Sequence, residues 1–251
     1  MRKWYKADLH IHSVLSPCAD LLMGPKNIIK RAQEVGLDII AITDHNSAEN
    51  VEAMTIAAQG TGITVLPGME ITSSEEAHFI CLFPSLDNMQ AFQIIVNDAL
   101  QPGKNDPDFF GPQYIVNEKN EVMGENTRLL ILATTLTMKQ IFSIVDSFQG
   151  LIYPAHVDRK GYSLLNQLGF VPHDVKIPAM EISWQGSMEK LKAQFPEVVN
   201  YPFITASDAH EASQIGRALT HFFIEEPTLQ EIRMAIFREN GREMRFDQNP
   251  E

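Results

Sequence analysis

The stretch LDIIAITDH, residues 37–45, is a short, almost uninterrupted apolar run that ends in two ionisable side chains. A run of this length is typical of a strand that is buried on both faces, as in parallel sheets covered by helices. Parallel strands need long crossover connections, which are usually helical. This one feature therefore restricts the chain to α/β architectures.

Similar apolar runs recur along the chain and are predicted to be further strands. They are ADLHIH (7–12), TGITVLPGME (61–70), AHFICLF (77–83), GLIYPAH (150–156), IPAMEIS (177–183), YPFITASDAH (201–210) and THFFIEE (220–226). Helices are expected between them. Pro25 opens one that ends near Val35, before Gly36. The alternation predicts a parallel α/β fold with a barrel-like closure.

Further helix boundaries follow from capping residues. Ser47 is expected to cap a helix that runs to about Gln59, and another helix is expected at 86–100. Thr228 with Glu231 predicts a capping box for the last helix.

One segment interrupts the alternation. Residues 101–128 are rich in Pro, Gly, Asn and Asp, and YIVNEKNEVMG predicts a hairpin with its turn near 118–120. Thr137 and Gln140 form a second capping box. We expect 86–148 to be an inserted helical lid or subdomain of a main domain made of 1–85 and 149–251. A plain surface excursion is the alternative.

Composition sets broad limits on function. The chain has 251 residues, 44% of them hydrophobic, which suits one large domain or a domain with an insertion. Two cysteines give no disulfide framework, no apolar run reaches a membrane span, and the N-terminus lacks a signal peptide's apolar region, so a cytoplasmic location is expected. A net charge of −12 disfavours unassisted binding to nucleic acid, although bound divalent cations would change that locally.

Ionisable side chains gather at the predicted strand ends, where ligands bind in parallel α/β folds. Six of the eight histidines lie in or just after predicted strands: His10, His12, His45, His78, His156 and His210. Carboxylates share these places: Asp8, Asp44, Glu70, Glu181 and Asp208. His78 opens its strand, so it reaches the same edge only if that strand is antiparallel or locally reversed. Together these side chains predict a metal site.

Each group alone has a structural alternative. An H-x-H motif such as His10 and His12 is short, although alternate residues of a strand do share a face. Glu70 could cap a helix, and Asp208 with His210 could form a surface turn. Their joint placement favours metal binding. The sequence contains no G-x-S-x-G elbow and no Gly-rich phosphate loop, so metal-activated water is preferred over a side-chain nucleophile.

The chain resembles the PHP (polymerase and histidinol phosphatase) superfamily of metal-dependent phosphoesterases. The motifs that carry the resemblance are DLHIHS (8–13), ITDHN (42–46), GMEIT (68–72) with His78, PAHVDR (154–159) and SDAHE (207–211). The resemblance implies a distorted seven-stranded β/α barrel with a two- or three-metal centre at the strand ends. The segment after His78 resembles the subdomain of stand-alone bacterial members.

The resemblance also implies a set of ligands. His10 and His12 would hold one metal with Glu70 and Asp208, and this group would hold the attacking water. Glu70 would bridge to a second metal held by His78 and His156. His45 and His210 would hold a third metal with help from a carboxylate, and zinc, manganese and iron all suit such ligands.

The chain departs from the family pattern after its second histidine. Many relatives have an aspartate five residues later, where this chain has Pro17. Asp20 is nominated as the replacement ligand, with Cys18 as the rival because thiolates bind zinc well.

Neighbouring residues are given supporting roles. Asp8 and Asp44 are expected to orient imidazoles, with local capping by Asp8 and direct ligation by Asp44 as alternatives. Arg159 and Arg217 are expected to bind the substrate phosphate, although Arg217 could instead pair with a carboxylate such as Glu181. Lys160 is expected to be solvated.

The expected function is hydrolysis of a phosphomonoester on a nucleotide, a nucleoside bisphosphate or the 5′ end of a short oligonucleotide. No membrane association and no stable nucleic-acid complex are expected. Histidinol-phosphate hydrolysis and amidohydrolase-like C–N hydrolysis are alternatives. A metal-containing module that binds nucleotides without catalysis is the alternative from another class.

Overall fold

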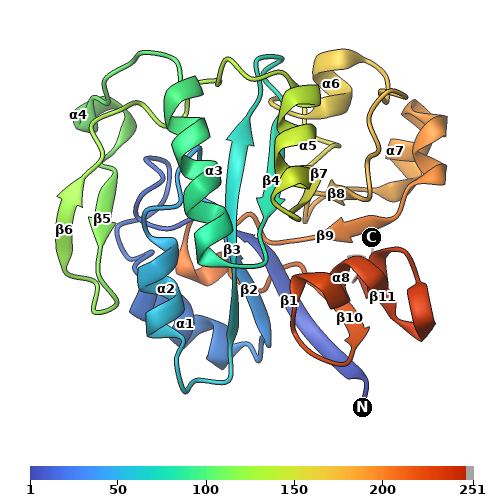
Figure 1. The fold of residues 1–251 in the computed structure, drawn as a ribbon, viewed down its shortest axis with the longest axis horizontal. Helices are drawn as coiled ribbons and strands as arrows, with labels where there is room; N and C mark the ends of the chain where they lie inside the picture. The colour runs from blue at the N-terminus through green and yellow to red at the C-terminus, as the bar shows by residue number, and fades with distance from the viewer. Residues whose placement is uncertain (247–251) are drawn as a thin grey trace.

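The computed structural model describes residues 1–246 as an α/β fold built on a curled seven-stranded sheet (Figure 1). The strand order is β11-β10-β1-β2-β3-β4-β7. These strands are β1 (Lys3–Ile11), β2 (Ile39–Ile42), β3 (Thr64–Thr72), β4 (His78–Leu82), β7 (Leu151–Pro154), β10 (Thr220–Ile224) and β11 (Glu243–Phe246). The predicted α/β class is confirmed, and the curled sheet is consistent with a barrel-like fold.

The sheet is mixed, which corrects the expectation of a parallel one. β1, β2 and β3 run parallel, whereas β4 is antiparallel to both β3 and β7, and β10 is antiparallel to β1 and β11. The reversal at β4 pairs its first residue, His78, with the last residue of β3, Thr72. His78 therefore lies at the edge where the parallel strands end, by the antiparallel route that the sequence left open.

A second, two-stranded sheet lies beside the ends of β7 and β1. It consists of β8 (Met180–Ile182) and β9 (Phe203–Thr205), which run parallel. Beyond β7, the Val157 N–H donates to the Glu181 carbonyl at 2.8 Å. Beyond β9, Ala209 forms a parallel bridge with Ile11. These hydrogen bonds connect β8 and β9 to both sides of the large sheet and bring their following loops to the same edge.

Helices cover the large sheet. They are α1 (Pro25–Glu34), α2 (Val51–Ala57), α3 (Leu86–Ala99), α4 (Pro107–Phe110), α5 (Met138–Ser147), α6 (Leu164–Leu168), α7 (Met188–Gln194) and α8 (Leu229–Ile236), with 3₁₀ turns η1 (Pro196–Asn200), η2 (Ala212–Gln214) and η3 (Glu239–Gly241). α1 has Pro25 in its first turn and is followed by Gly36 at φ +71°, as predicted. Within residues 1–246, no helix combines the length and the hydropathy that crossing a bilayer requires.

Two of the three predicted caps differ from expectation. Ser47 does not cap α2, because its hydroxyl donates to the Glu49 carboxylate and the helix begins after Asn50. At α8, the Thr228 hydroxyl accepts from the Glu231 N–H. The Glu231 carboxylate instead accepts from the Glu225 N–H at 2.9 Å, so the reciprocal bond of a capping box is replaced. The Thr137–Gln140 box at α5 is confirmed.

The core packs on both faces of the central strands. In β2, Ile39 and Ala41 enter one apolar cluster and Ile40 and Ile42 enter another. This alternation explains the uninterrupted apolar run of the sequence, because a strand covered on both faces has no solvent-facing position.

The segment 86–148 combines packed helices with an outlying hairpin. α3 and α5 contribute Phe92 and Phe142 to the same buried cluster as Phe79 of β4. The predicted hairpin forms as β5 (Tyr114–Val116) and β6 (Val122–Glu125). Asn50 holds it, since its side-chain amide donates to the Tyr114 carbonyl and accepts from the Val116 N–H. The division into 1–85 with 149–251 and an inserted 86–148 stays a proposal.

Phe79 offers a direct test of this packing. It is fully buried and its ring meets that of Phe142 edge-on at 5.6 Å. We expect Phe79→Ala to lower the free energy of unfolding by about 3–5 kcal/mol, since it leaves a cavity in the core. Urea denaturation followed by circular dichroism measures this. Phe109→Ala, at a ring that is 78% exposed, is the matched control and should cost less than about 0.5 kcal/mol. Equal effects of the two substitutions would contradict the packing described.

Candidate metal centre

Glu70, at the end of β3, is the centre around which the predicted ligands converge. Its carboxylate is 1% exposed. The Oε1 atom lies 2.8 Å from His78 Nδ1 and 3.1 Å from His156 Nε2. The Oε2 atom lies 3.0 Å from His45 Nδ1 and 3.3 Å from His12 Nε2. One buried carboxylate thus contacts imidazoles that come from the ends of four strands.

His10 and His12 direct unprotonated nitrogens at each other. His10 Nδ1 lies 3.0 Å from a carboxylate oxygen of Glu181, and an ionised carboxylate can only accept a hydrogen bond. His12 Nδ1 lies 3.0 Å from the Ser16 hydroxyl, whose own proton is donated to Asp44 at 2.6 Å. Both Nδ1 atoms therefore carry the proton in the neutral rings, which leaves both Nε2 atoms as acceptors. These Nε2 atoms are 3.1 Å apart.

Asp208 adds a third acceptor to this pair. Its Oδ1 atom lies 3.2 Å from the Nε2 atoms of both His10 and His12. Three lone-pair atoms that face one another in a buried site repel unless a cation lies between them. The donor set, two imidazoles and a carboxylate, is one that divalent metals accept. The residues present therefore fit a metal ion.

In the metal-free protein, protons take the place of that positive charge. Burial alone would lower the pKa of His10, but Glu181, Asp208 and Glu70 raise it well above its ordinary value. Burial and the nearby His210 hold the pKa of His12 well below the ordinary value. Burial alone would raise the pKa of Glu70, but His78, His10 and His45 hold it well below its usual range. These shifts favour positive charge on His10 and negative charge on Glu70, whereas His12 favours its neutral form.

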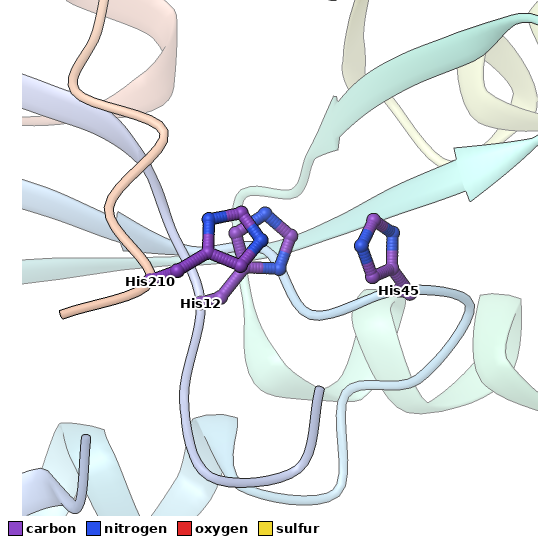
Figure 2. Close-up of side chains that lie close together, drawn as sticks. All are labelled: His12, His45 and His210. Atoms are coloured by element: carbon purple, nitrogen blue, oxygen red, sulfur yellow. The ribbon is translucent and has the colours of Figure 1, made fainter. Parts of the chain in front are cut away.

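His45 and His210 form a second group of imidazoles close to His12. Figure 2 shows the rings of His12 and His210 lying one over the other, with His45 beside them. The ring centroids of His12 and His210 are 4.1 Å apart, and those of His12 and His45 are 4.6 Å apart. Potential metal-binding atoms lie within 4.8 Å of one another in three sets: His12, His45 and His210; His10, His12 and Asp208; and His45, Glu70 and His78.

Two of the predicted ligands lie on strained backbone. His156 has φ +30° and Asp208 has φ +48°, in the region that side chains other than glycine rarely adopt. Strain of this kind is found at functional sites, where the surrounding structure holds a side chain in a required direction. Both residues lie in the loop that follows a short strand, His156 after β7 and Asp208 after β9, and both side chains contact the cluster.

Cys18, and not Asp20, lies beside this cluster. The Asp20 side chain is exposed and accepts a hydrogen bond from the Leu22 N–H at 2.7 Å, which closes a local turn. Cys18 lines the cavity of the site. The residue is exposed on the outer side of the site, and desolvation on its inner side would raise the pKa of the thiol, but His45 and His210 lower that pKa to about 6. This placement favours the rival over the nominated Asp20.

Asp8 and Asp44 hold the loops that carry the ligands. The Asp8 carboxylate accepts hydrogen bonds from the Ser207 N–H and the Gly216 N–H, both at 2.9 Å. These two bonds hold backbone and do not orient an imidazole. Asp44 accepts from Ser13 and Ser16, and Ser16 in turn accepts from His12. Asp44 therefore reaches an imidazole through a hydroxyl group.

The two arginines differ in placement. Arg159 lines the cavity, and its guanidinium forms a 2.6 Å ion pair with Asp208 Oδ2. Arg217 donates to the backbone carbonyls of Ser207 and Asp208, and its guanidinium lies 4.3 Å above the Trp184 ring. The carboxylate suggested as its partner, Glu181, instead binds His10. A phosphate-binding role for Arg217 stays a prediction.

Three contributors were not assigned these roles from the sequence. Glu181 is one of the carboxylates at the predicted strand ends, and this position in the sequence indicates that it lies near the site. Ser16 follows His12 by four residues in a tight turn, which no sequence pattern marks. Tyr162 stacks on the His78 ring with centroids 4.8 Å apart and is half exposed at the cavity.

A cavity of about 250 Å³ opens onto the cluster. It is lined by Cys18, His45, Glu70, His78, Ile131, His156, Arg159, Gly161, Tyr162, Asp208 and His210. Its wall thus combines proposed ligands with one cation, Arg159. A small anionic group in this cavity would meet both the metal-binding atoms and the guanidinium.

Comparison with known proteins agrees with this geometry. The family model described as PHP domain matches residues 8–165, and the model described as PHP-associated matches residues 191–240. A 5′-3′ exoribonuclease of Haemophilus influenzae is 33% identical over 75 residues, which cover 30% of this chain and 26% of that protein. These residues are a small part of that enzyme.

Two solved structures share the fold. The lesion-specific endonuclease Q of Pyrococcus furiosus superposes with a TM-score of 0.76 at 21% identity, covering 96% of this chain and 58% of that one. A two-domain protein of Bacteroides vulgatus that contains a PHP-like metal-dependent phosphoesterase gives a TM-score of 0.56 at 18% identity, covering 98% and 65%. The chain spans less than two thirds of each of these structures. The match to the family model covers more than half of the chain, and the chain therefore belongs to the PHP domain family of metal-dependent hydrolases.

Proposed function

We propose that this protein hydrolyses phosphomonoesters carried by a nucleotide, a nucleoside bisphosphate or the 5′ end of a short oligonucleotide. The observation that carries the proposal is the set of facing acceptors, His10 Nε2, His12 Nε2 and Asp208 Oδ1, all within 3.2 Å of a neighbour. A cation bound between these acceptors would offset their mutual repulsion. The nuclease and phosphoesterase names among the related proteins support a phosphate ester as substrate.

The ligand roles proposed from the sequence are retained with one change. His10, His12, Glu70 and Asp208 would hold one ion, and His78 and His156 would hold a second with help from Glu70. His45 and His210 would hold a third ion if three bind, with Cys18 in place of Asp20 as the neighbouring donor. Zinc, manganese and iron are the candidate metals.

The metal ions, when bound, would lower the pKa of a coordinated water and neutralise phosphoryl oxygens. The chain's own residues supply orientation. Glu181 and Ser16 fix the protons of His10 and His12 on Nδ1, and Arg159 presents a guanidinium to an anionic group in the cavity. Burial of the cluster excludes bulk water and so strengthens these electrostatic contacts.

Phosphate release tests the function itself. We expect the chain, reconstituted separately with manganese, zinc or iron, to release phosphate from at least one of a panel of nucleotides, histidinol phosphate and 5′-phosphorylated oligomers. His10→Ala should reduce the rate at least about 100-fold, because loss of a ligand exceeds the effect of losing its supporting hydrogen bond. His173→Ala, at an exposed histidine, is the control. If the chain binds nucleotides but releases no phosphate with manganese, zinc or iron, it is a non-catalytic binding module.

Metal affinity tests the role of Glu181. We expect Glu181→Gln to weaken metal binding by about 10–100-fold, because the amide no longer stabilises the protonated Nδ1 of His10 as a carboxylate does. Competition with a chelator measures this, with the exposed Glu189→Gln as control. Unchanged metal affinity in Glu181→Gln would show that Glu181 does not support metal binding.

Metal affinity is also expected to depend on pH. Because the pKa values of His10 and His45 are raised, protons compete with the metal for these rings, and metal affinity measured by the same chelator competition should increase as the pH rises.

The two arginines are separated by a comparison of their variants. We expect Arg159→Ala to raise KM by about tenfold or more, since a charge-assisted hydrogen bond to the substrate is lost. Arg217→Ala should mainly lower the melting temperature, because its guanidinium holds two backbone carbonyls. Steady-state kinetics and thermal denaturation of both variants give the answer. The reverse pattern would assign phosphate binding to Arg217.

A further inference from the structure

A second cavity adjoins the metal centre. It has a volume of about 480 Å³ and lies beyond the ends of β7 and β8, beside α6 and α7. Arg159 lines both this cavity and the one that opens onto the proposed ligands. An elongated molecule with one end at the metal centre can therefore continue past Arg159 into the second cavity, which we name the α7 groove.

The α7 groove is cationic on an acidic protein. Arg159, Lys160 and Lys190 line it, although the chain as a whole carries a net charge of −12. Lys160 and Lys190 are exposed, and neither has an ion-pair partner among residues 1–246. These two lysines lie beside Arg159, whose guanidinium pairs with Asp208, and form a local cationic patch on an acidic protein, which favours a ligand with several negative charges.

The acidic residue in the groove does not cancel these charges by pairing with them. Asp158 is the carboxylate of the described lining, and its two oxygens accept from the N–H and the hydroxyl of Ser183, at 2.7 and 2.6 Å. The lysines therefore remain available to an incoming ligand. The same bonds tie the loop after β7 to the end of β8 and give the groove a rigid floor.

The rest of the lining is uncharged, with apolar residues (Val157, Leu191 and Phe195) beside polar ones. Asn166, Gln185 and Gln194 offer amide groups that both donate and accept hydrogen bonds. In the adjoining cavity of the metal centre, the half-exposed Tyr162 provides an aromatic ring, one face of which stacks on His78. A cationic groove with an exposed aromatic ring beside it is typical of single-strand nucleic-acid sites.

We propose that the α7 groove binds the strand that continues from the hydrolysed phosphate, so that the substrate is a single-stranded oligonucleotide and not a mononucleotide. This inference rests on the proposed function for its chemistry, but binding in the groove can be measured without turnover. Lys160 and Lys190 are then positioning residues that contact phosphates of the strand, and Arg159 joins the groove to the metal centre.

Binding is tested on the metal-loaded protein with a fluorescent octamer whose 5′-phosphate is replaced by a methylenephosphonate, in which the bond that the proposed reaction breaks resists hydrolysis. We expect Lys160→Gln with Lys190→Gln to weaken binding about tenfold and to reduce the slope of log affinity against log salt by about 1.4, from two lost phosphate contacts. Lys30→Gln with Lys119→Gln is the matched control. It removes two exposed lysines in α1 and in the β5–β6 turn, on the opposite side of the view in Figure 1 from α7.

Kinetics supply an independent measurement. We expect kcat/KM to increase with length from the mononucleotide to the octamer, and the ratio of octamer to mononucleotide to fall toward one in the groove double variant. A polyglutamate peptide serves as a competitor of another chemical class. Displacement of the octamer by this peptide at equal charge concentration would show a general polyanion surface and overturn the proposal.

The failures of the two proposals are distinguishable. Hydrolysis that is independent of length, with binding equal in wild type and the groove variant, overturns the groove and leaves the phosphoesterase standing. Octamer binding that depends on the two lysines, with no phosphate released under any metal, supports the groove and overturns the proposed activity.

Discussion

The mutual repulsion of buried lone pairs at the strand ends is the constraint on which the rest of this structure depends. His10, His12 and Asp208 direct acceptors at one another, and Glu70 lies within reach of five imidazoles. Burying such groups costs free energy unless a positive charge accompanies them. Protons provide that charge in the metal-free protein, as the raised pKa of His10 indicates. A divalent cation provides it more effectively, because it offers two charges and several coordination positions at once.

The scaffold opposes this repulsion by leaving the side chains little freedom. β1, β2 and β3 end at one edge, and the reversal at β4 adds His78 to that edge. Glu181 and the Asp44–Ser16 pair hold the rings of His10 and His12 in one orientation. The positive φ values at His156 and Asp208 show that the backbone accepts strain in order to aim these two side chains.

Charge is distributed unevenly over the molecule. The acidic surface as a whole repels polyanions, whereas Arg159 and the two lysines of the α7 groove form a local cationic path that begins at the metal centre. Arg159 is paired with Asp208 at 2.6 Å, so the guanidinium and the proposed metal ion would share the same carboxylate. Under this proposal, metal binding would affect the position of Arg159.

The sequence alone determined the α/β class, most strand positions and the residues that gather at the strand ends. It could do so because burial on both faces of β2 imposes an apolar run, and because alternate residues of an extended strand share a face, as His10 and His12 do. Tertiary structure alone decided the direction of β4, the placement of the Cys18 side chain in the cavity with His45 and His210, and the partners of Glu181, Arg217 and Ser47. Those outcomes depend on which groups meet across long sequence separations, and local patterns carry no information about such distances.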